Sequence, residues 1–170
     1  MGKEKKSNSE VKGSKFRLTR AETFVSAPMS EVRKAVLDYG KYSTIIPAFQ
    51  KSKVLKQDGT AAQVFLQIPF LKGAANIWTV ESFTAPVADG KGEKITGTKI
   101  KSNIDDIKAT WLYRPVDDAH TVLTLEIYVS LDVPAPLSLI TSETEDACGH
   151  GVRGVKAHAE SNVSAKTPAK

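Results

Sequence analysis

Apolar and polar residues alternate along three segments of the chain, at 61–70, 106–116 and 121–132. One face of these segments carries Ala62, Val64, Leu66, Ile68, Phe70, Ile107, Ala109, Trp111, Tyr113, Leu123, Leu125, Ile127, Val129 and Leu131. Alternation with a period of two is typical of a strand with one buried face and one solvated face. The pattern therefore predicts three strands whose shared apolar face needs a cover.

Further strands are predicted at about 17–26, 49–57, 74–84 and 93–102, which gives seven in all. Asp58-Gly59 separates two of these runs and is a strong signal for a tight hairpin. Looser turns are expected at 88–92, at Asp105-Asp106 and at Asp117-Asp118. Short strands separated by turns at this interval indicate an antiparallel sheet.

Helical spacing replaces the alternation just after the first strand. Val32, Ala35, Val36 and Tyr39 form one apolar stripe behind Pro28, and proline is well tolerated at a helix start. We expect two short helices, at about 29–38 and 41–46, the second ending at Pro47.

A long helix is predicted at about 136–160, where it would cover the sheet. Its inward stripe includes Ile140, Thr144, Cys148, Gly151 and Val152, and small residues occupy the middle. Glycine inside a helix costs about 0.5–1 kcal/mol relative to alanine, so the small residues need a reason. They either leave an open cavity beneath the helix or allow it to pack closely on Trp111 and Trp78.

The net charge of +5 is concentrated at the N-terminus. Residues 1–20 carry seven Lys or Arg and two Glu, whereas residues 21–155 carry 14 basic and 16 acidic side chains. We expect a disordered basic tail at 1–15, one ligand-binding domain at 16–160 and a second disordered tail at 161–170. Because the excess of positive charge lies only in the N-terminal tail, the sequence does not favour a nucleic-acid or ribosome partner.

The chain resembles the START/Bet v 1-like superfamily, also called SRPBCC or polyketide cyclase/dehydrase proteins. It is most similar to the branch with the coenzyme Q-binding proteins and the ribosome-association toxin. The resemblance covers about 17–160 and rests on Val25-x-Ala27-Pro28-x-x-Glu31-Val32, Asp38-Tyr39-x-x-Tyr42-x-x-x-x-Pro47, Ser52-x-Val54-Leu55, Gly97-Thr98, Trp111-x-Tyr113-x-Pro115 and Pro134-x-Pro136-Leu137.

This resemblance implies an α+β helix-grip fold: a bent antiparallel sheet of about seven strands wrapped on a long C-terminal helix, with two short helices after strand 1. It also implies an apolar ligand, such as a lipid, quinone or polyketide, held between sheet and helix. The candidate cavity residues are Val64, Leu66, Ile68, Trp78, Trp111, Tyr113, Leu123, Leu125, Ile127, Ile140, Thr144, Cys148 and Gly151.

Few residues suggest chemistry. His120 falls in a turn, and His150 and His158 are too far apart on the last helix to share a metal ion. Cys148 is expected to be a buried structural thiol. Glu81, Lys99 and Glu126 are titratable side chains on strands. No nucleophile, phosphate-binding or metal-binding motif is present, so we predict no catalytic residue, no metal and no cofactor.

Three hypotheses follow. The first is a protein that binds or transports an apolar small molecule, the second an aromatase/cyclase-type enzyme using the same cavity, and the third a ribosome-associated interaction protein. No apolar run reaches the roughly 20 residues that span a bilayer. Transient contact with a membrane surface stays open. No targeting signal is visible, so a cytoplasmic location is expected, although an exported mature form would look the same.

Overall fold

A computed structural model describes residues 3–167, and the arrangement of its elements follows from the alternating segments. The strands are β1 (Lys5–Glu10), β2 (Arg17–Val25), β3 (Lys51–Asp58), β4 (Ala61–Phe70), β5 (Ala75–Phe83), β6 (Val87–Asp89), β7 (Gly92–Ser102), β8 (Asp106–Asp117) and β9 (His120–Ser130). The helices are α1 (Met29–Leu37), the short 3-10 turn η1 (Tyr39–Lys41), α2 (Tyr42–Ile45) and α3 (Leu137–Lys166).

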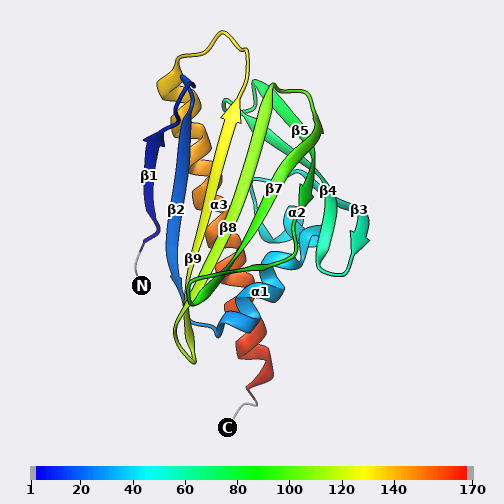
Figure 1. Ribbon diagram of the computed structural model, residues 1–170, viewed down its shortest axis with the longest axis vertical. Coiled ribbons are helices and arrows are strands. Elements are labelled where there is room, and N and C mark those ends of the chain that lie inside the picture. Colours follow the sequence, from blue (N-terminus) through cyan, green and yellow to red (C-terminus); the bar gives the residue numbers. More distant parts are fainter. Residues whose placement is uncertain (1–2, 168–170) are drawn as a thin grey trace.

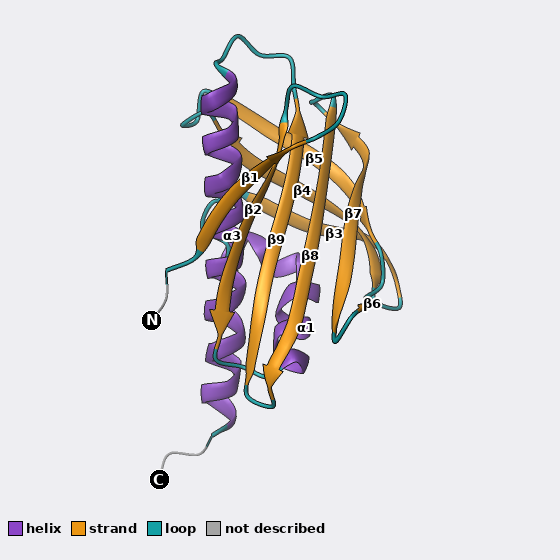
Figure 2. Ribbon diagram, turned by 60° about the vertical axis from the view of Figure 1, so that its left-hand side comes forward, coloured by secondary structure: helices purple, strands orange, loops and turns teal. Residues whose placement is uncertain are grey.

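All nine strands belong to one antiparallel sheet with the order β1-β2-β9-β8-β7-β5-β4-β3, and β6 pairs with β7. The sheet bends so that β3, β4 and β5 cross behind the long strands, and α3 lies behind β2 and β9 on the same side (Figure 1). Viewed from the side, α3 and α1 lie on the concave face of the sheet (Figure 2). The predicted helix-grip α+β fold is thereby confirmed, with nine strands in the described chain instead of about seven.

The concave face carries the apolar positions that the alternation identified. Leu123, Leu125 and Ile127 of β9 are each at most 6% exposed, and Trp111 lies opposite Leu125 in the register of β8 and β9. A shift of the strand pairing by one residue would have moved these apolar side chains to the solvent face. The register predicted for the three alternating strands is therefore correct.

Helix α3 covers the β2 and β9 side of this face, and glycine lets it approach neighbouring elements closely. A Cβ atom on Gly154 would collide with the backbone carbonyl of Ile45 in α2. Any larger residue at this position would push α2 away from α3. Gly154 thus fixes the distance between the long helix and the short helices.

The expectation of a disordered tail at 1–15 is wrong, because the structure forms β1 there. The strand pairs with β2 from Lys5 opposite Glu22 to Glu10 opposite Arg17. All six of its side chains are exposed, so no apolar pattern could reveal it. Side-chain contacts to α3 hold it instead: Lys6 with Asp146 at 2.6 Å, Asn8 with Glu145 at 2.5 Å, and Glu4 with Arg153.

The C-terminal boundary also differs. Helix α3 continues to Lys166, beyond the end expected at 160, and Lys166 Nζ lies 2.5 Å from Glu31 Oε1 in α1. The contact gives the last helical turn a partner that the sequence pattern does not show. The remainder of the tail expected at 161–170, residues 168–170, falls outside the described chain.

Deleting residues 1–11 is expected to lower the melting temperature, because β1 supplies a ladder of backbone hydrogen bonds and three side-chain contacts to α3. Exposed ion pairs contribute little each, so we expect a loss of about 1–2 kcal/mol, or roughly 2–8 °C in a chain of this size. Thermal unfolding followed by circular dichroism measures the change. An unaltered melting temperature would show that β1 adds nothing to stability.

Candidate functional site

A narrow apolar cavity lies between the sheet and the short helices. Its volume is about 30 Å³, enough for roughly one water molecule. The lining comes from α2, the segment after it, and strands β4, β5, β8 and β9. The lining residues are Tyr42, Phe49, Leu66, Ile68, Glu81, Phe83, Ile107, Ala109, Trp111, Leu125 and Ile127. Ten of the eleven side chains are apolar or aromatic, so the interior favours an apolar occupant.

Aromatic side chains form the wall opposite the sheet. Tyr42 meets Trp111 edge to face at 6.3 Å and Phe49 at 6.1 Å between ring centroids. The Tyr42 hydroxyl donates a hydrogen bond to the carbonyl of Val36 at 2.5 Å, which turns its polar end away from the cavity. Burial raises the pKa of Tyr42 well above its usual value. Tyr42 therefore presents an apolar ring to the cavity.

Glu81 is the one acidic group in the lining. It lies on the inner face of β5 and is 1% exposed, and its Oε1 atom has no hydrogen-bond partner among the described residues. Burial raises the pKa of the Glu81 carboxyl to about 8, and the nearby negative charge of Asp106 adds to the effect. At neutral pH this side chain is mostly a neutral carboxylic acid, which can both donate and accept a hydrogen bond.

Two more buried polar atoms near Glu81 lack partners. Tyr39 Oη and Thr79 Oγ1 are buried and make no hydrogen bond within the described chain. Tyr39 stacks on Phe83 with 4.7 Å between ring centroids, and burial, with a smaller effect from Glu81, raises its pKa. Buried polar groups are normally paired. Of these three unpartnered atoms, Glu81 Oε1 belongs to a lining residue of the cavity, whereas Tyr39 and Thr79 are not among the lining residues.

The lysine opposite Glu81 does not neutralise it. Lys99 is the register partner of Glu81 across β5 and β7, but Lys99 Nζ donates a hydrogen bond to the carbonyl of Asp105 at 2.5 Å. The Lys99 side chain is exposed. The Glu81 carboxyl therefore faces the cavity without a counter-ion from residues 3–167.

Five of the thirteen candidate residues line this cavity: Leu66, Ile68, Trp111, Leu125 and Ile127. Val64 and Leu123 are buried on the same face but do not reach the cavity. Tyr113 lies under α1, where its hydroxyl donates to Glu93 at 2.7 Å. Ile140 and Thr144 are buried in the first turns of α3, and Thr144 Oγ1 donates to the Ile140 carbonyl.

The structure places Trp78 on the opposite face of the sheet from the cavity. In β5 the buried positions are Ile77, Thr79, Glu81 and Phe83, so Trp78 points outward. Apolar residues occur on both faces of this strand: Ile77 and Phe83 on the inner face, and Trp78 and Val80 on the outer face. The prediction that Trp78 lines the cavity is therefore wrong, and Glu81 was not among the candidate cavity residues.

Cys148 and Gly151 lie where α3 packs tightly on the sheet. A Cβ atom on Gly151 would come within 2.5 Å of Leu125 Cδ2 and 3.5 Å of Trp111 Cη2. Cys148 is fully buried, its Sγ atom is 3.4 Å from Thr19 Oγ1, and burial raises its pKa to about 12. The open space beneath α3 is therefore absent at Gly151, and close packing explains the small residues there.

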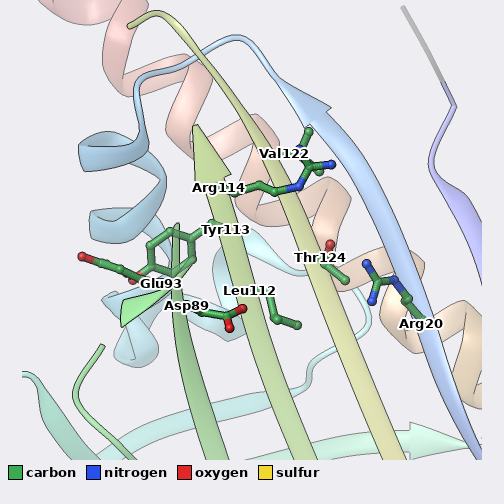
Figure 3. Close-up of a pocket in the computed structure, with 8 residues that line it drawn as sticks. All are labelled: Arg20, Asp89, Glu93, Leu112, Tyr113, Arg114, Val122 and Thr124. Atoms are coloured by element: carbon green, nitrogen blue, oxygen red, sulfur yellow. The ribbon is translucent and has the colours of Figure 1, made fainter. Parts of the chain in front are cut away.

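Larger depressions occur on the surface, but charged and apolar side chains are mixed in the lining of the one beside β6. One of about 190 Å³ lies where the outer face of the sheet meets β6 and is lined by Arg20, Asp89, Glu93, Leu112, Tyr113, Arg114, Val122 and Thr124 (Figure 3). Arg20 is already paired with Glu126 and Glu22 at 2.8 and 3.0 Å, and Glu93 with Arg33 at 2.6 Å. Two of its four charged side chains, Arg20 and Glu93, are therefore satisfied by ion pairs within the protein. The smaller apolar cavity is the better candidate because apolar side chains surround one buried carboxyl oxygen, Glu81 Oε1, that has no partner among the described residues.

Metal binding and membrane spanning find no support in the described residues. No three His, Cys, Asp or Glu side chains within 3–167 come together as metal ligands. None of the described helices is both long enough and apolar enough to cross a bilayer.

Comparison with known proteins agrees with this architecture. The profile of a family described as polyketide cyclase/dehydrase and lipid transport matches residues 25–147. The chain belongs to this family. The match covers the short helices, most of the sheet and the first part of α3. The narrower resemblance to coenzyme Q-binding proteins remains a prediction. No curated protein matches the sequence significantly.

Several solved structures share the fold. A STAR-related lipid transfer protein fragment from Xanthomonas axonopodis superposes with a TM-score of 0.79 at 19% identity, covering 94% of each chain. The Zhui aromatase/cyclase from a Streptomyces species gives 0.72 at 16% identity, covering 86% of this chain and 95% of the other. The lipid transfer and protein localization domain of human StarD13 superposes with a TM-score of 0.71 at 13% identity, covering 92% of this chain and 84% of the other.

Proposed function

We propose that this protein binds an uncharged, largely apolar small molecule that carries one hydrogen-bonding oxygen. The observation that carries the proposal is the unpartnered Glu81 carboxyl in an otherwise apolar cavity. A hydroxyl or carbonyl oxygen of a lipid, quinone or polyketide would complete its hydrogen bonding. The family description and the lipid-transfer neighbour support the same ligand class.

Ligand binding needs the cavity to widen. Ligand pockets for molecules of ordinary size measure about 300–1,000 Å³, far above the 30 Å³ found here. The wall formed by Tyr42 and Phe49 belongs to the single-turn helix α2 and the segment after it. This wall has less regular hydrogen bonding than the sheet, so we expect it to move when a ligand enters.

An aromatase/cyclase-type enzyme is the second candidate function. A carboxyl with a pKa of about 8 is close to the value that suits general acid–base catalysis at neutral pH. The hydroxyl of Tyr39 is unpartnered nearby, and one structural neighbour is an aromatase/cyclase. If the protein is an enzyme, Glu81→Gln will bind the reactive chain but fail to turn it over.

Filling the cavity tests the binding function. Ala109 lines it, so Ala109→Leu is expected to weaken uptake of a fluorescent fatty-acid or quinone probe at least tenfold. The matched control is Ala88→Leu, which makes the same change on the exposed strand β6. Fluorescence titration measures both, and native mass spectrometry of fresh protein identifies any co-purifying molecule. Equal probe binding by both variants, or none by the parent, would contradict the proposal.

A further inference from the structure

Lysines and apolar side chains gather on the outer face of the sheet, opposite the helices. The strand registers place them in three adjacent rows across β3, β4, β5, β7 and β8. The first row contains Lys51, Gln67 and Trp78. The second row contains Lys53, Phe65, Val80 and Lys101. The third row contains Lys56, Gln63, Ser82, Thr98 and Lys108. We call this surface the basic face, defined by Lys51, Lys53, Lys56, Lys101, Lys108, Phe65, Trp78 and Val80.

The five lysines of the basic face are exposed. None of them forms an ion pair with another residue of the described chain. No carboxylate occupies the three rows. On the next row Glu126 is already paired with Arg20, while Asp58, Asp105 and Asp106 lie at the strand ends. The face is therefore locally positive, although residues 21–155 as a whole are slightly acidic.

Apolar groups lie between these charges. Phe65, Trp78 and Val80 are partly exposed. Two β-bulges, in β3 and β7, add aliphatic side chains, because Leu55 and Ile100 are each 51% exposed. The helices pack on the concave side (Figure 2), so no element of the described chain covers this surface. Exposed apolar groups ringed by polar side chains mark interaction sites.

We propose that the basic face docks on an anionic membrane surface. Lysines near a membrane gain free energy from the negative leaflet potential, and aromatic and aliphatic side chains insert at the level of the headgroups. All five cations are lysines, whose ammonium groups suit a diffuse layer of charge. Recognition of individual phosphates, as in nucleic acids, more often uses the fork of arginine.

Docking on this face does not depend on the cavity. Glu81 and the other lining residues of β5 point inward, whereas Trp78 and Val80 of the same strand point outward. A variant that disrupts the cavity should still bind vesicles. The proposals for the docking surface and for the ligand site can therefore be tested separately.

Vesicle co-sedimentation tests the proposal with the full chain. We expect binding to phosphatidylcholine vesicles that contain roughly one third phosphatidylglycerol or phosphatidylserine, and little binding to phosphatidylcholine alone. Binding should fall strongly between about 0.1 M and 0.5 M salt because screening shortens the range of the attraction. Equal binding to both kinds of vesicle, or none to either, would overturn the proposal.

The triple variant Lys53→Gln, Lys101→Gln and Lys108→Gln locates the surface. Each lysine near an anionic membrane contributes about fivefold in affinity, so the three together should reduce binding on the order of a hundredfold. The matched control replaces Lys12, Lys72 and Lys91 by glutamine; these are exposed lysines in turns outside the basic face. An equal loss in both variants would show that total charge, not this face, drives binding.

Tryptophan fluorescence supplies a second readout. Trp78 lies on the basic face and Trp111 is buried in the cavity wall, so brominated anionic lipids should quench Trp78 selectively. Trp78→Phe should then remove most of the quenching while retaining the fold by circular dichroism. Unchanged quenching in that variant would overturn the placement. Binding of single-stranded RNA without binding of anionic vesicles would assign the face to nucleic acid instead.

Discussion

Replacing Glu81 by glutamine is expected to raise the free energy of unfolding by an amount that grows between about pH 4.5 and pH 8. The carboxyl has a pKa of about 8 in the folded protein and an ordinary value of 4.5. Below pH 4.5 it is protonated in both the folded and the unfolded state. Between the two values the unfolded chain loses the proton while the folded protein keeps it, so stability falls as the pH rises.

The size of this effect is large for one side chain. The difference between the two pKa values corresponds to about 3–5 kcal/mol once the pH exceeds about 8 and the carboxyl is ionised in both states. Glutamine has nearly the same shape, stays neutral and avoids this loss. At pH 4 the variant and the parent should therefore unfold at similar denaturant concentrations, and they should diverge as the pH rises.

Urea unfolding at several pH values measures the difference directly. Glu126→Gln is the matched control, because Glu126 lies on the outer face and pairs with Arg20 at 2.8 Å. That variant should not gain stability with rising pH. Parallel pH profiles for the parent and Glu81→Gln would mean that the carboxyl finds a partner or reaches water in solution.

A buried acid that lowers stability at neutral pH needs another reason to be present. Natural proteins hold few unsatisfied buried groups, and strained or unsatisfied ones concentrate at functional sites. A bound ligand that pairs with Glu81 would recover part of the lost free energy. Ligand should therefore stabilise the parent more than Glu81→Gln, which links the pH experiment to the proposed function.

The sequence predicted the fold because alternation is strict where one face is buried and the other solvated. In β9 the apolar positions from Leu123 to Val129 lie at most 6% exposed, and this pattern alone gives the register. Strand β1 was missed because its six residues are all exposed and are held by backbone pairing and by polar contacts to α3. Such contacts join residues about 140 positions apart and leave no local pattern.

The site was harder to predict than the fold. Five candidate residues reached the cavity because they lie on the alternating strands. Glu81 was noted as a titratable residue on a strand, but apolar residues lie on both faces of β5, and choosing Trp78 for the cavity turned Glu81 to the wrong side. Tyr42 and Phe49 were missed as lining residues because they come from α2 and the segment after it, whose position depends on packing against α3.

Gly151→Leu is expected to destabilise the protein by about 1–3 kcal/mol, because a larger side chain overpacks a filled region. A Cβ atom at this position already lies within 2.5 Å of Leu125 Cδ2. Leu125 is 2% exposed, and the cavity that it borders measures only about 30 Å³, so it has little space into which it can move. The loss should exceed the gain of up to about 1 kcal/mol from removing a glycine inside a helix.

The matched control is Ala157→Leu, which adds the same side chain on the exposed side of α3 and should change stability by less than about 0.5 kcal/mol. Chemical unfolding of both variants gives the comparison. A more stable Gly151→Leu that also lost probe binding would place an open cavity beneath the middle of α3. The expected loss of stability instead assigns the small residues of α3 to close helix–sheet contact, and leaves ligand binding to the space between Glu81 and the aromatic wall.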